Sequence, residues 1–220
     1  MWNRFSTRVT LLIAGCVYGL VACVGQAPVP QVTVPAPSSK SKAELMTGAT
    51  AELLAANCFG CHGPQGHSLA PSVPSLAGLS ESYFFKVMQA YQYGGRFGSV
   101  MGRIALAYDD AEIRGMAGYF GAQSPRLHSQ SVGTSLIDQG RRLHRLYCRD
   151  CHGDLETPPE ADAVTLNGQW RSYLHWTLQD YLVGINRTEA GMSEALTKLM
   201  RQQGMAGLEA LLDYYASARH

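Results

Sequence analysis

The sequence predicts an all-α protein that consists of two copies of one module. The pentapeptide Cys-Phe-Gly-Cys-His at residues 58–62 recurs as Cys-Arg-Asp-Cys-His at 148–152. Subtracting 90 from the second copy aligns the residues that follow the pentapeptide without a gap, as far as Gly184 on Gly94. Apolar residues in both copies recur at spacings of three and four, which is typical of helices, and little of the chain alternates as strands do.

The first 23 residues have the pattern of an export signal. Two arginines precede an apolar stretch at 9–20 that is too short to span a bilayer. The following Leu-Val-Ala-Cys at 20–23 is typical of a lipoprotein cleavage site, so we expect Cys23 to be lipidated and to tether the protein to a bacterial membrane. Ordinary signal cleavage near Ala22 or Ala27 is the alternative.

The remaining chain divides into a tether, two modules and a linker. Residues 24–42 are rich in proline, valine and serine, which predicts an extended tether. We assign the first module to 43–122, the linker to 123–136 and the second module to 137–220. The formal net charge is +1 without a long run of either sign, so no nucleic-acid partner is indicated.

Each module is expected to contain at least three helices. One leads into the pentapeptide (51–56 and 141–147), and one lies in the middle of the module (81–91 and 171–182). A final helix begins at Asp109 in the first copy, where the acidic residues favour a helix N-terminus, and contains Leu208 to Tyr215 in the second.

The repeated pentapeptide is the attachment motif for haem c. In such a motif the two cysteine sulfurs form thioethers to the haem, and the histidine becomes an axial iron ligand. Four of the six cysteines, Cys58, Cys61, Cys148 and Cys151, lie in the two motifs. Disulfides or a zinc site are alternatives for paired cysteines in an exported protein, but neither explains why His62 and His152 follow the pairs.

Methionines at matched positions are candidates for the second axial ligand. Met101 lies 43 residues after Cys58 and Met192 lies 44 after Cys148, and we expect both in loops between the middle and final helices. A methionine ligand closes the iron and raises its potential, which makes the site an electron carrier.

Other methionines do not repeat, and they are expected to serve as packing residues. Met88 aligns with Leu178, and Met116 aligns with Leu211 when Phe120 is registered with Tyr215; both are expected in the core. Met200 and Met205 are expected to fill space in a slightly longer second copy.

Groups around the haems are less clearly marked in the sequence. Pro71 follows the first motif at a distance from which its carbonyl group could orient His62, whereas its counterpart in the second copy is Ala161. Arg96, Arg103 and Trp170 are candidates to contact haem propionates or edges, although exposed arginines are usually only solvated.

Three further segments carry a resemblance to a known family. They are Leu-Leu-Ala-Ala-Asn at 53–57 before the first motif, Pro-Ser-Leu-Ala-Gly at 74–78 and Ser-Val-Met-Gly-Arg-Ile-Ala at 99–105. With similar segments in the second module, at 166–170 and 210–217, they resemble the dihaem cytochrome subunit of flavocytochrome c sulfide dehydrogenase. Dihaem cytochromes of the c4 type are similar to that subunit, so the same segments resemble them as well.

The resemblance implies two class I cytochrome c domains related by a pseudo-twofold axis, with two covalently bound haem c groups. It also implies an FAD-containing partner subunit that oxidises sulfide, and a small periplasmic cytochrome or similar acceptor. Alternatives are a standalone carrier of the c4 type that feeds a terminal oxidase, and a dihaem peroxidase or haem sensor, which would need one vacant iron. No residue is expected to act as a catalytic acid or base.

Overall fold

The computed structural model describes residues 49–98, 100–155, 164 and 166–217. All of these belong to one compact unit, Met46–His220. The predicted signal peptide (1–23), the lipidation site Cys23 and the tether (24–42) lie outside the described residues. Within the described part of the chain, no helix is both long enough and apolar enough to cross a membrane.

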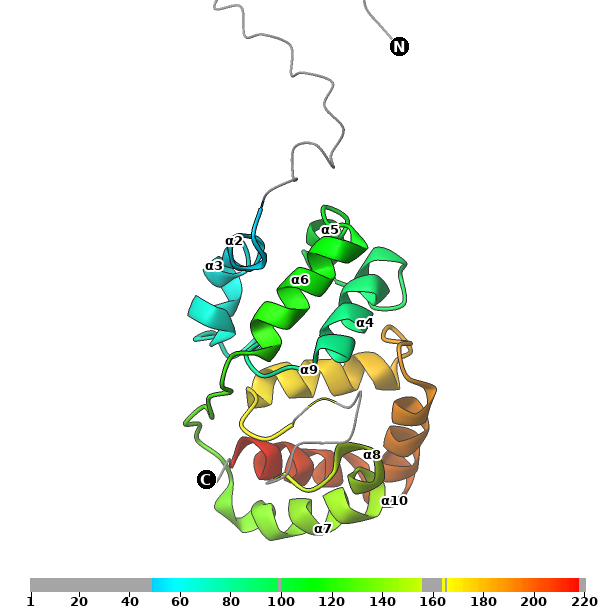
Figure 1. Ribbon diagram of the computed structural model, residues 1–220. Coiled ribbons are helices and arrows are strands. Elements are labelled where there is room, and N and C mark those ends of the chain that lie inside the picture. Colours follow the sequence, from blue (N-terminus) through cyan, green and yellow to red (C-terminus); the bar gives the residue numbers. More distant parts are fainter. Residues whose placement is uncertain (1–48, 99, 156–163, 165, 218–220) are drawn as a thin grey trace, which may run out of the picture. The chain divides into compact units, whose positions relative to one another are not determined.

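The described residues of the first half of this unit form five α-helices and one 3-10 turn (Figure 1). The helices are α2 (Ala51–Ala56), α3 (Phe59–His62), α4 (Glu81–Gln92), α5 (Met101–Ala105) and α6 (Asp110–Gly121), and the turn is η1 (Pro64–Gly66). Side chains cap the longer helices as the sequence suggests. Ser80 accepts from the backbone N–H of Tyr83 at 3.2 Å, and Asp109 and Glu112 form a capping box at the start of α6.

The second half has the same order of elements, with two neighbours fused. A 3-10 turn, η2 (Thr134–Leu136), precedes α7 (Ile137–Tyr147), α8 (Arg149–His152), α9 (Arg171–Leu182) and α10 (Ala190–Ala216). The helix α10 corresponds to α5 and α6 together, and it bends at Gly204, whose φ of 62° is not helical. The described residues form no strand, only an isolated antiparallel bridge between Arg96 and Asn186.

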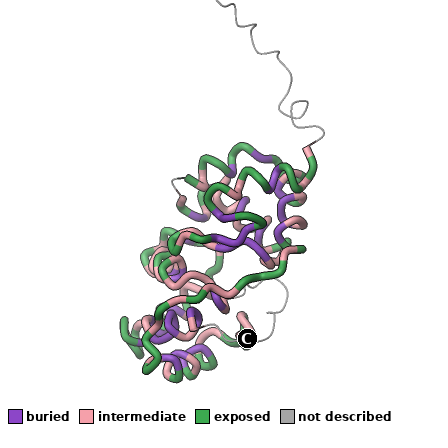
Figure 2. The backbone as a smooth tube through the Cα atoms, turned by 90° about the vertical axis from the view of Figure 1, so that its left-hand side faces the viewer, coloured by how far each residue is buried: buried purple, intermediate pink, exposed green. Residues whose placement is uncertain are grey.

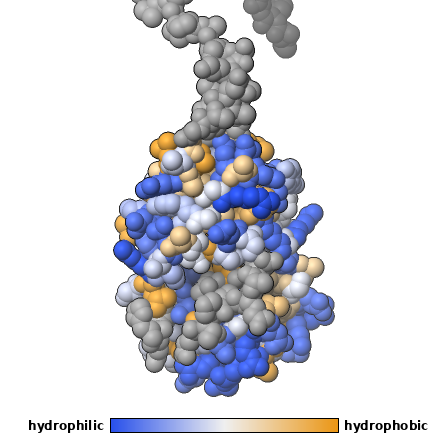
Figure 3. Space-filling view, in the orientation of Figure 1, coloured by the Kyte–Doolittle hydropathy of each residue, from blue (hydrophilic) through white to orange (hydrophobic). Residues whose placement is uncertain are grey.

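Each half has its own hydrophobic core, built where its first and last long helices pack together. The helix α2 packs on α6, and α7 packs on α10. The buried residues alternate with exposed ones along these helices, as expected for amphipathic helices (Figure 2). The surface over α7 is strongly hydrophilic, whereas apolar side chains form scattered patches elsewhere (Figure 3). The largest fully buried apolar side chains are Ile113, Met116 and Phe120 in the first half and Leu199, Leu208, Leu211 and Leu212 in the second.

Equivalent hydrogen bonds confirm the register of the repeat. The N–H of Gly78 donates to the carbonyl of Phe120 at 2.9 Å, and the N–H of Gly168 donates to the carbonyl of Tyr215 at 3.0 Å. Both glycines have positive φ, 76° and 71°, a conformation that residues with a Cβ rarely adopt. The registration of Phe120 with Tyr215 is therefore confirmed, and it places Met116 and Leu211 at equivalent core positions.

Candidate functional site

Each Cys-x-x-Cys-His motif forms a single helical turn. In the first copy the N–H groups of Cys61 and His62 donate to the carbonyl of Cys58 at 3.2 and 2.9 Å. The equivalent distances to the carbonyl of Cys148 are 3.3 and 2.9 Å. Positions i, i+3 and i+4 share one face of a helix, so both sulfurs and the imidazole of a motif are directed to the same side. All four cysteines are free thiols.

A backbone carbonyl orients the histidine of each motif. The Nδ1 atom of His62 lies 2.8 Å from the carbonyl oxygen of Pro74, and Nδ1 of His152 lies 3.1 Å from that of Val164. A carbonyl oxygen only accepts, so Nδ1 carries the proton and Nε2 keeps its lone pair for a metal.

The protonation state of the two histidines suits the same role. Burial lowers the pKa of His62 and of His152 below the usual value, and the carbonyl hydrogen bond opposes this shift without cancelling it. Both imidazoles are therefore neutral near pH 7, as metal coordination requires.

Burial acts on the cysteines as well. It raises the pKa of the Cys58 thiol to about 11, with a smaller contribution from Cys61. It also raises the pKa of the Cys148 thiol, although a hydrogen bond with Tyr215 opposes this shift. Neither thiol is ionised near neutral pH in the metal-free protein.

One continuous cavity of about 530 Å³ adjoins both motifs. Its volume and its mainly apolar wall suit a large, flat, mostly apolar cofactor. The wall includes all six residues of the two motifs that were predicted to bind haem, together with Met101 and Met192. Apolar side chains supply much of the remainder, among them Leu76, Phe84, Leu174, Leu178, Leu196 and Leu199.

The two predicted methionine ligands lie on helices and face this cavity. Met101 is the first residue of α5, and Met192 lies in the first turn of α10, so the prediction that both occupy loops is wrong. A short helix is possible here because neither segment contains a proline. The sulfur of Met192 lies 3.5 Å from Nε2 of His152, so the two candidate ligands of the second site face each other.

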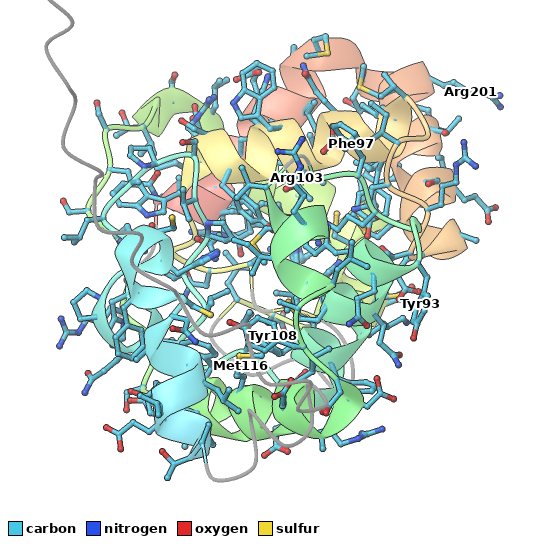
Figure 4. The ribbon with its side chains drawn as sticks, turned by 90° about the horizontal axis from the view of Figure 1, so that it is seen from above. Tyr93, Phe97, Arg103, Tyr108, Met116 and Arg201 are labelled. Carbon is cyan, nitrogen blue, oxygen red and sulfur yellow. The ribbon has the colours of Figure 1, made fainter. Side chains whose placement is uncertain are left out.

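The competing methionines of the first half are more deeply buried, although Met88 also lines the cavity. Met88 and Met116 are 5% and 0% exposed and belong to the first core, as predicted. In Figure 4, Met116 lies among the helices of the first half, whereas Tyr93 lies at its edge. Met200 packs against the second core, but Met205 is 46% exposed, so its predicted packing role is wrong. It directly follows the bend at Gly204, which turns it away from the core.

The prediction that the carbonyl of Pro71 orients His62 is also wrong. That carbonyl accepts from the N–H of Tyr173 at 3.0 Å and so satisfies one of the free N–H groups at the start of α9. The carbonyl that reaches His62 belongs to Pro74, and adding 90 gives Val164, so both sites use the same device and no proline is needed.

Trp170, the other residue predicted near a haem, also lies at the contact between the two halves. Its indole N–H donates to the carbonyl of Ser68 at 3.2 Å, and its ring stacks on His128 at 4.1 Å between centroids. Neither Trp170 nor Pro71 is among the residues that line the cavity.

Sequence analysis missed the role of His144. This side chain is 1% exposed, and its Nε2 lies 2.7 Å from the carbonyl of Gly153 while Nδ1 lies 3.1 Å from the hydroxyl of Tyr215. It therefore joins α7 to the end of the second motif and to α10. Its counterpart in the first copy is Leu54, so the repeat contained no signal for this contact.

Comparison with known proteins identifies the family. Cytochrome c4 of Azotobacter vinelandii is 30% identical over 180 residues, which cover 73% of this chain and 83% of the relative. The chain belongs to the cytochrome c4 family. Reduced recombinant cytochrome c4 from Pseudomonas stutzeri has the same fold, with a TM-score of 0.66 and 27% identity over 77% of this chain and 97% of that structure. The chain matches no protein-family model.

Membership of the cytochrome c4 family confirms the predicted fold, two class I cytochrome c domains in an all-α chain. The chain is a dihaem c-type cytochrome with two covalently bound haem c groups, and it acts as an electron carrier rather than as an enzyme. The cytochrome subunit of sulfide dehydrogenase from Chlorobaculum tepidum is also similar, 36% identical over 92 residues. Those residues cover 42% of this chain and 83% of that subunit.

Proposed function

We propose that the two motifs and the two methionines hold one haem in each half of the protein. Cys58 and Cys61 would form the thioethers of the first haem, and Cys148 and Cys151 those of the second. His62 with Met101, and His152 with Met192, would be the axial ligands. The haem supplies an iron that alternates between the ferrous and ferric states. The observation that carries this proposal is the facing pair of His152 Nε2 and Met192 Sδ, 3.5 Å apart on the cavity wall.

The protein residues contribute geometry and a dry surrounding rather than proton chemistry. Both ring nitrogens of each histidine have a role, one toward a carbonyl and one toward the cavity, so neither is free to act as an acid or base. Apolar side chains form most of the cavity wall and would shield a bound haem from water, which would limit the reorganisation that accompanies a change of iron charge. A dihaem peroxidase or haem sensor is less well supported because each half offers two candidate ligands.

We further propose that the electrons come from an FAD-containing sulfide dehydrogenase and leave to a small periplasmic acceptor. Similarity to the cytochrome subunit of a sulfide dehydrogenase supports this partner. Similarity to cytochrome c4 over most of the chain supports the alternative, a standalone carrier that feeds a terminal oxidase. Affinity purification of the full chain from its native host distinguishes the two. A bound flavoprotein and reduction of the haems by sulfide support the first, whereas sulfide-independent reduction without a flavoprotein supports the second.

The location is likewise a proposal. Export to the periplasm and a lipid on Cys23 follow from the pattern of residues 1–23, and residues 24–42 would then separate the haem domains at 43–122 and 137–220 from the membrane. Changing Cys23→Ala should move the mature protein from the membrane fraction to the soluble periplasmic fraction. An unchanged distribution of the variant would contradict lipid anchoring.

A further inference from the structure

Arg96 is a buried cation surrounded by aromatic side chains. It is 7% exposed, and its Nη2 donates to the hydroxyl of Tyr173 at 3.0 Å. Its guanidinium also lies 5.3 Å from the centre of the Tyr91 ring. Among the described residues, no carboxylate forms an ion pair with it. A buried guanidinium without an anion is strongly unfavourable, because its lost hydration is only partly replaced.

The neighbouring tyrosines do not supply the missing negative charge. Burial raises the pKa of Tyr83 and of Tyr91 above the usual value, despite the opposing effect of Arg96. Both hydroxyls are therefore neutral at any physiological pH. The hydroxyls of Tyr83 and Tyr173 form hydrogen bonds with the guanidinium but leave its charge unbalanced.

The cluster lies where the two halves of the protein meet. Arg96 forms the antiparallel bridge with Asn186, which is its own counterpart in the repeat because 96 plus 90 is 186. Beside it, the N–H of Arg187 donates to the carbonyl of Gly95 at 2.9 Å. A bridge between equivalent residues is expected where a pseudo-twofold axis passes between two copies.

Asn186 adds a buried donor that has no hydrogen-bond partner. Its side chain is 1% exposed, and its Oδ1 accepts from the N–H of Thr188 at 3.2 Å and from the hydroxyl of Thr188 at 2.9 Å. Its Nδ2, by contrast, is buried without a hydrogen-bond partner. A buried charge without an anion and a buried donor without a partner therefore lie at this junction, and buried polar groups are normally satisfied.

Arg96 also lines the cavity that adjoins both haem motifs. The occupant of that cavity is therefore the natural source of the anion, and haem c carries two propionate carboxylates. We propose that Arg96 binds a haem propionate at the junction of the two modules and thereby raises the reduction potential of that haem. This inference rests on the proposed attachment of one haem in each module.

The repeat gives the proposal a second consequence, which is a difference between the reduction potentials of the two haems. The equivalent position in the second module is the neutral Asn186, so the positive charge has no symmetric counterpart. A cation near one propionate stabilises the more negative, ferrous state of that haem, as hydrogen bonding and local charge do in other haem sites. Arg96 thus separates the two potentials and gives electron transfer between the haems a direction.

The test is a spectroelectrochemical titration of the haem-loaded full chain and of three variants. Arg96→Gln removes the charge but keeps most of the side-chain volume, and Arg96→Lys keeps the charge. Arg201→Gln is the matched control, because Arg201 is exposed and projects from the edge of the molecule (Figure 4). We expect Arg96→Gln to lower one midpoint potential by about 59 mV, which is a tenfold change in the equilibrium constant for reduction of that haem. Arg96→Lys and Arg201→Gln should each change this constant less than threefold.

The outcomes separate this inference from the proposed function. A wild-type chain that contains fewer than two covalent haems would contradict the proposed function before any potential is measured. Two haems with midpoints that respond equally to Arg96→Gln and Arg201→Gln would overturn the inference alone. If Arg96→Gln does not fold, a crystal structure of the haem-loaded wild type decides. A guanidinium nitrogen within 3.5 Å of a propionate oxygen supports the inference, and a guanidinium that contacts only tyrosines refutes it.

Discussion

Removing Met101 should open one iron to an external ligand, whereas removing a core methionine of the same module should not. Met101 lines the cavity and is only partly buried, and Met116 is completely buried in the first core. In the reduced wild type both irons are expected to be closed, so no carbon monoxide should bind at neutral pH. Met101→Ala and Met192→Ala should each bind one equivalent per chain, and the double variant should bind two.

The two substitutions should rank in the opposite order for stability: Met116→Ala should destabilise the protein more than Met101→Ala. Truncation of a fully buried methionine costs about 2–5 kcal/mol, and Met116 has no exposed surface, so we expect about 3–4 kcal/mol for Met116→Ala. Met101 is half-buried and packs at the rim of the first core, so Met101→Ala should cost about 1–2 kcal/mol in packing. Denaturant titration followed by circular dichroism measures both losses under the same conditions.

The two assays together exclude a trivial explanation. If carbon monoxide bound only because a damaged core admits it, then Met116→Ala, the less stable variant, would bind more than Met101→Ala. That ranking would refute the assignment of Met101 as a ligand. Binding of a full equivalent by the wild type would refute the closed-iron interpretation as a whole and favour a sensor or peroxidase.

Three further predictions concern packing, charge and pH. Gly140→Ala should destabilise the second module by about 1–3 kcal/mol, because its Cβ would meet the backbone of α10, whereas Gly118→Ala, whose Cβ would meet only the Glu81 side chain at ordinary contact distance, should stabilise α6 slightly; thermal unfolding compares them. Asp213→Asn should lower the free energy of unfolding by about 2 kcal/mol in urea titrations, because the buried carboxylate accepts a hydrogen bond from Nε of Arg171 at 2.6 Å. A loss below about 0.5 kcal/mol would show that the charge of Asp213 is not needed for stability. Burial lowers the pKa of His128 in the folded protein, so the unfolded chain binds more protons and the free energy of unfolding should fall as the pH drops below about 6.5. His128→Gln should make this pH dependence weaker. An unchanged slope in the variant would contradict the prediction.

The repeat explains why so much of the fold was predictable. Helices at 51–56, 81–91 and 171–182 agree with the structure to within one residue, because apolar periodicity is a local property of the sequence. The internal alignment also separated Met101 and Met192 from the buried Met88 and Met116, a distinction that residue type alone does not make. Because both copies form the same kind of site, a residue type that recurs at the same position in both is a better candidate for that site than one that occurs in a single copy.

Groups that act through the backbone, or that occur in only one copy, could not be predicted from the internal alignment. The carbonyls of Pro74 and Val164 orient the histidines, but every residue has a carbonyl, so the choice of Pro71 had no firm basis in side-chain chemistry. His144 replaces a leucine of the first copy and is visible only when tertiary contacts are known. Met205 became exposed because the bend at Gly204 redirects the helix, a local change that helical periodicity does not anticipate.

The contact between Arg96 and Asn186 illustrates what two modules in one chain allow. In a symmetric dimer of a single module, an arginine on the axis would face its own copy, and directly opposed residues of an antiparallel pair have Cβ atoms about 5 Å apart. Two buried guanidinium groups carried by directly opposed residues would repel each other. A duplicated chain can keep arginine in one copy and place asparagine opposite it, as residues 96 and 186 do. The same difference between residues 96 and 186 would make the two haem surroundings unequal, so the proposed asymmetry between the potentials and the absence of repulsion at the junction have one origin.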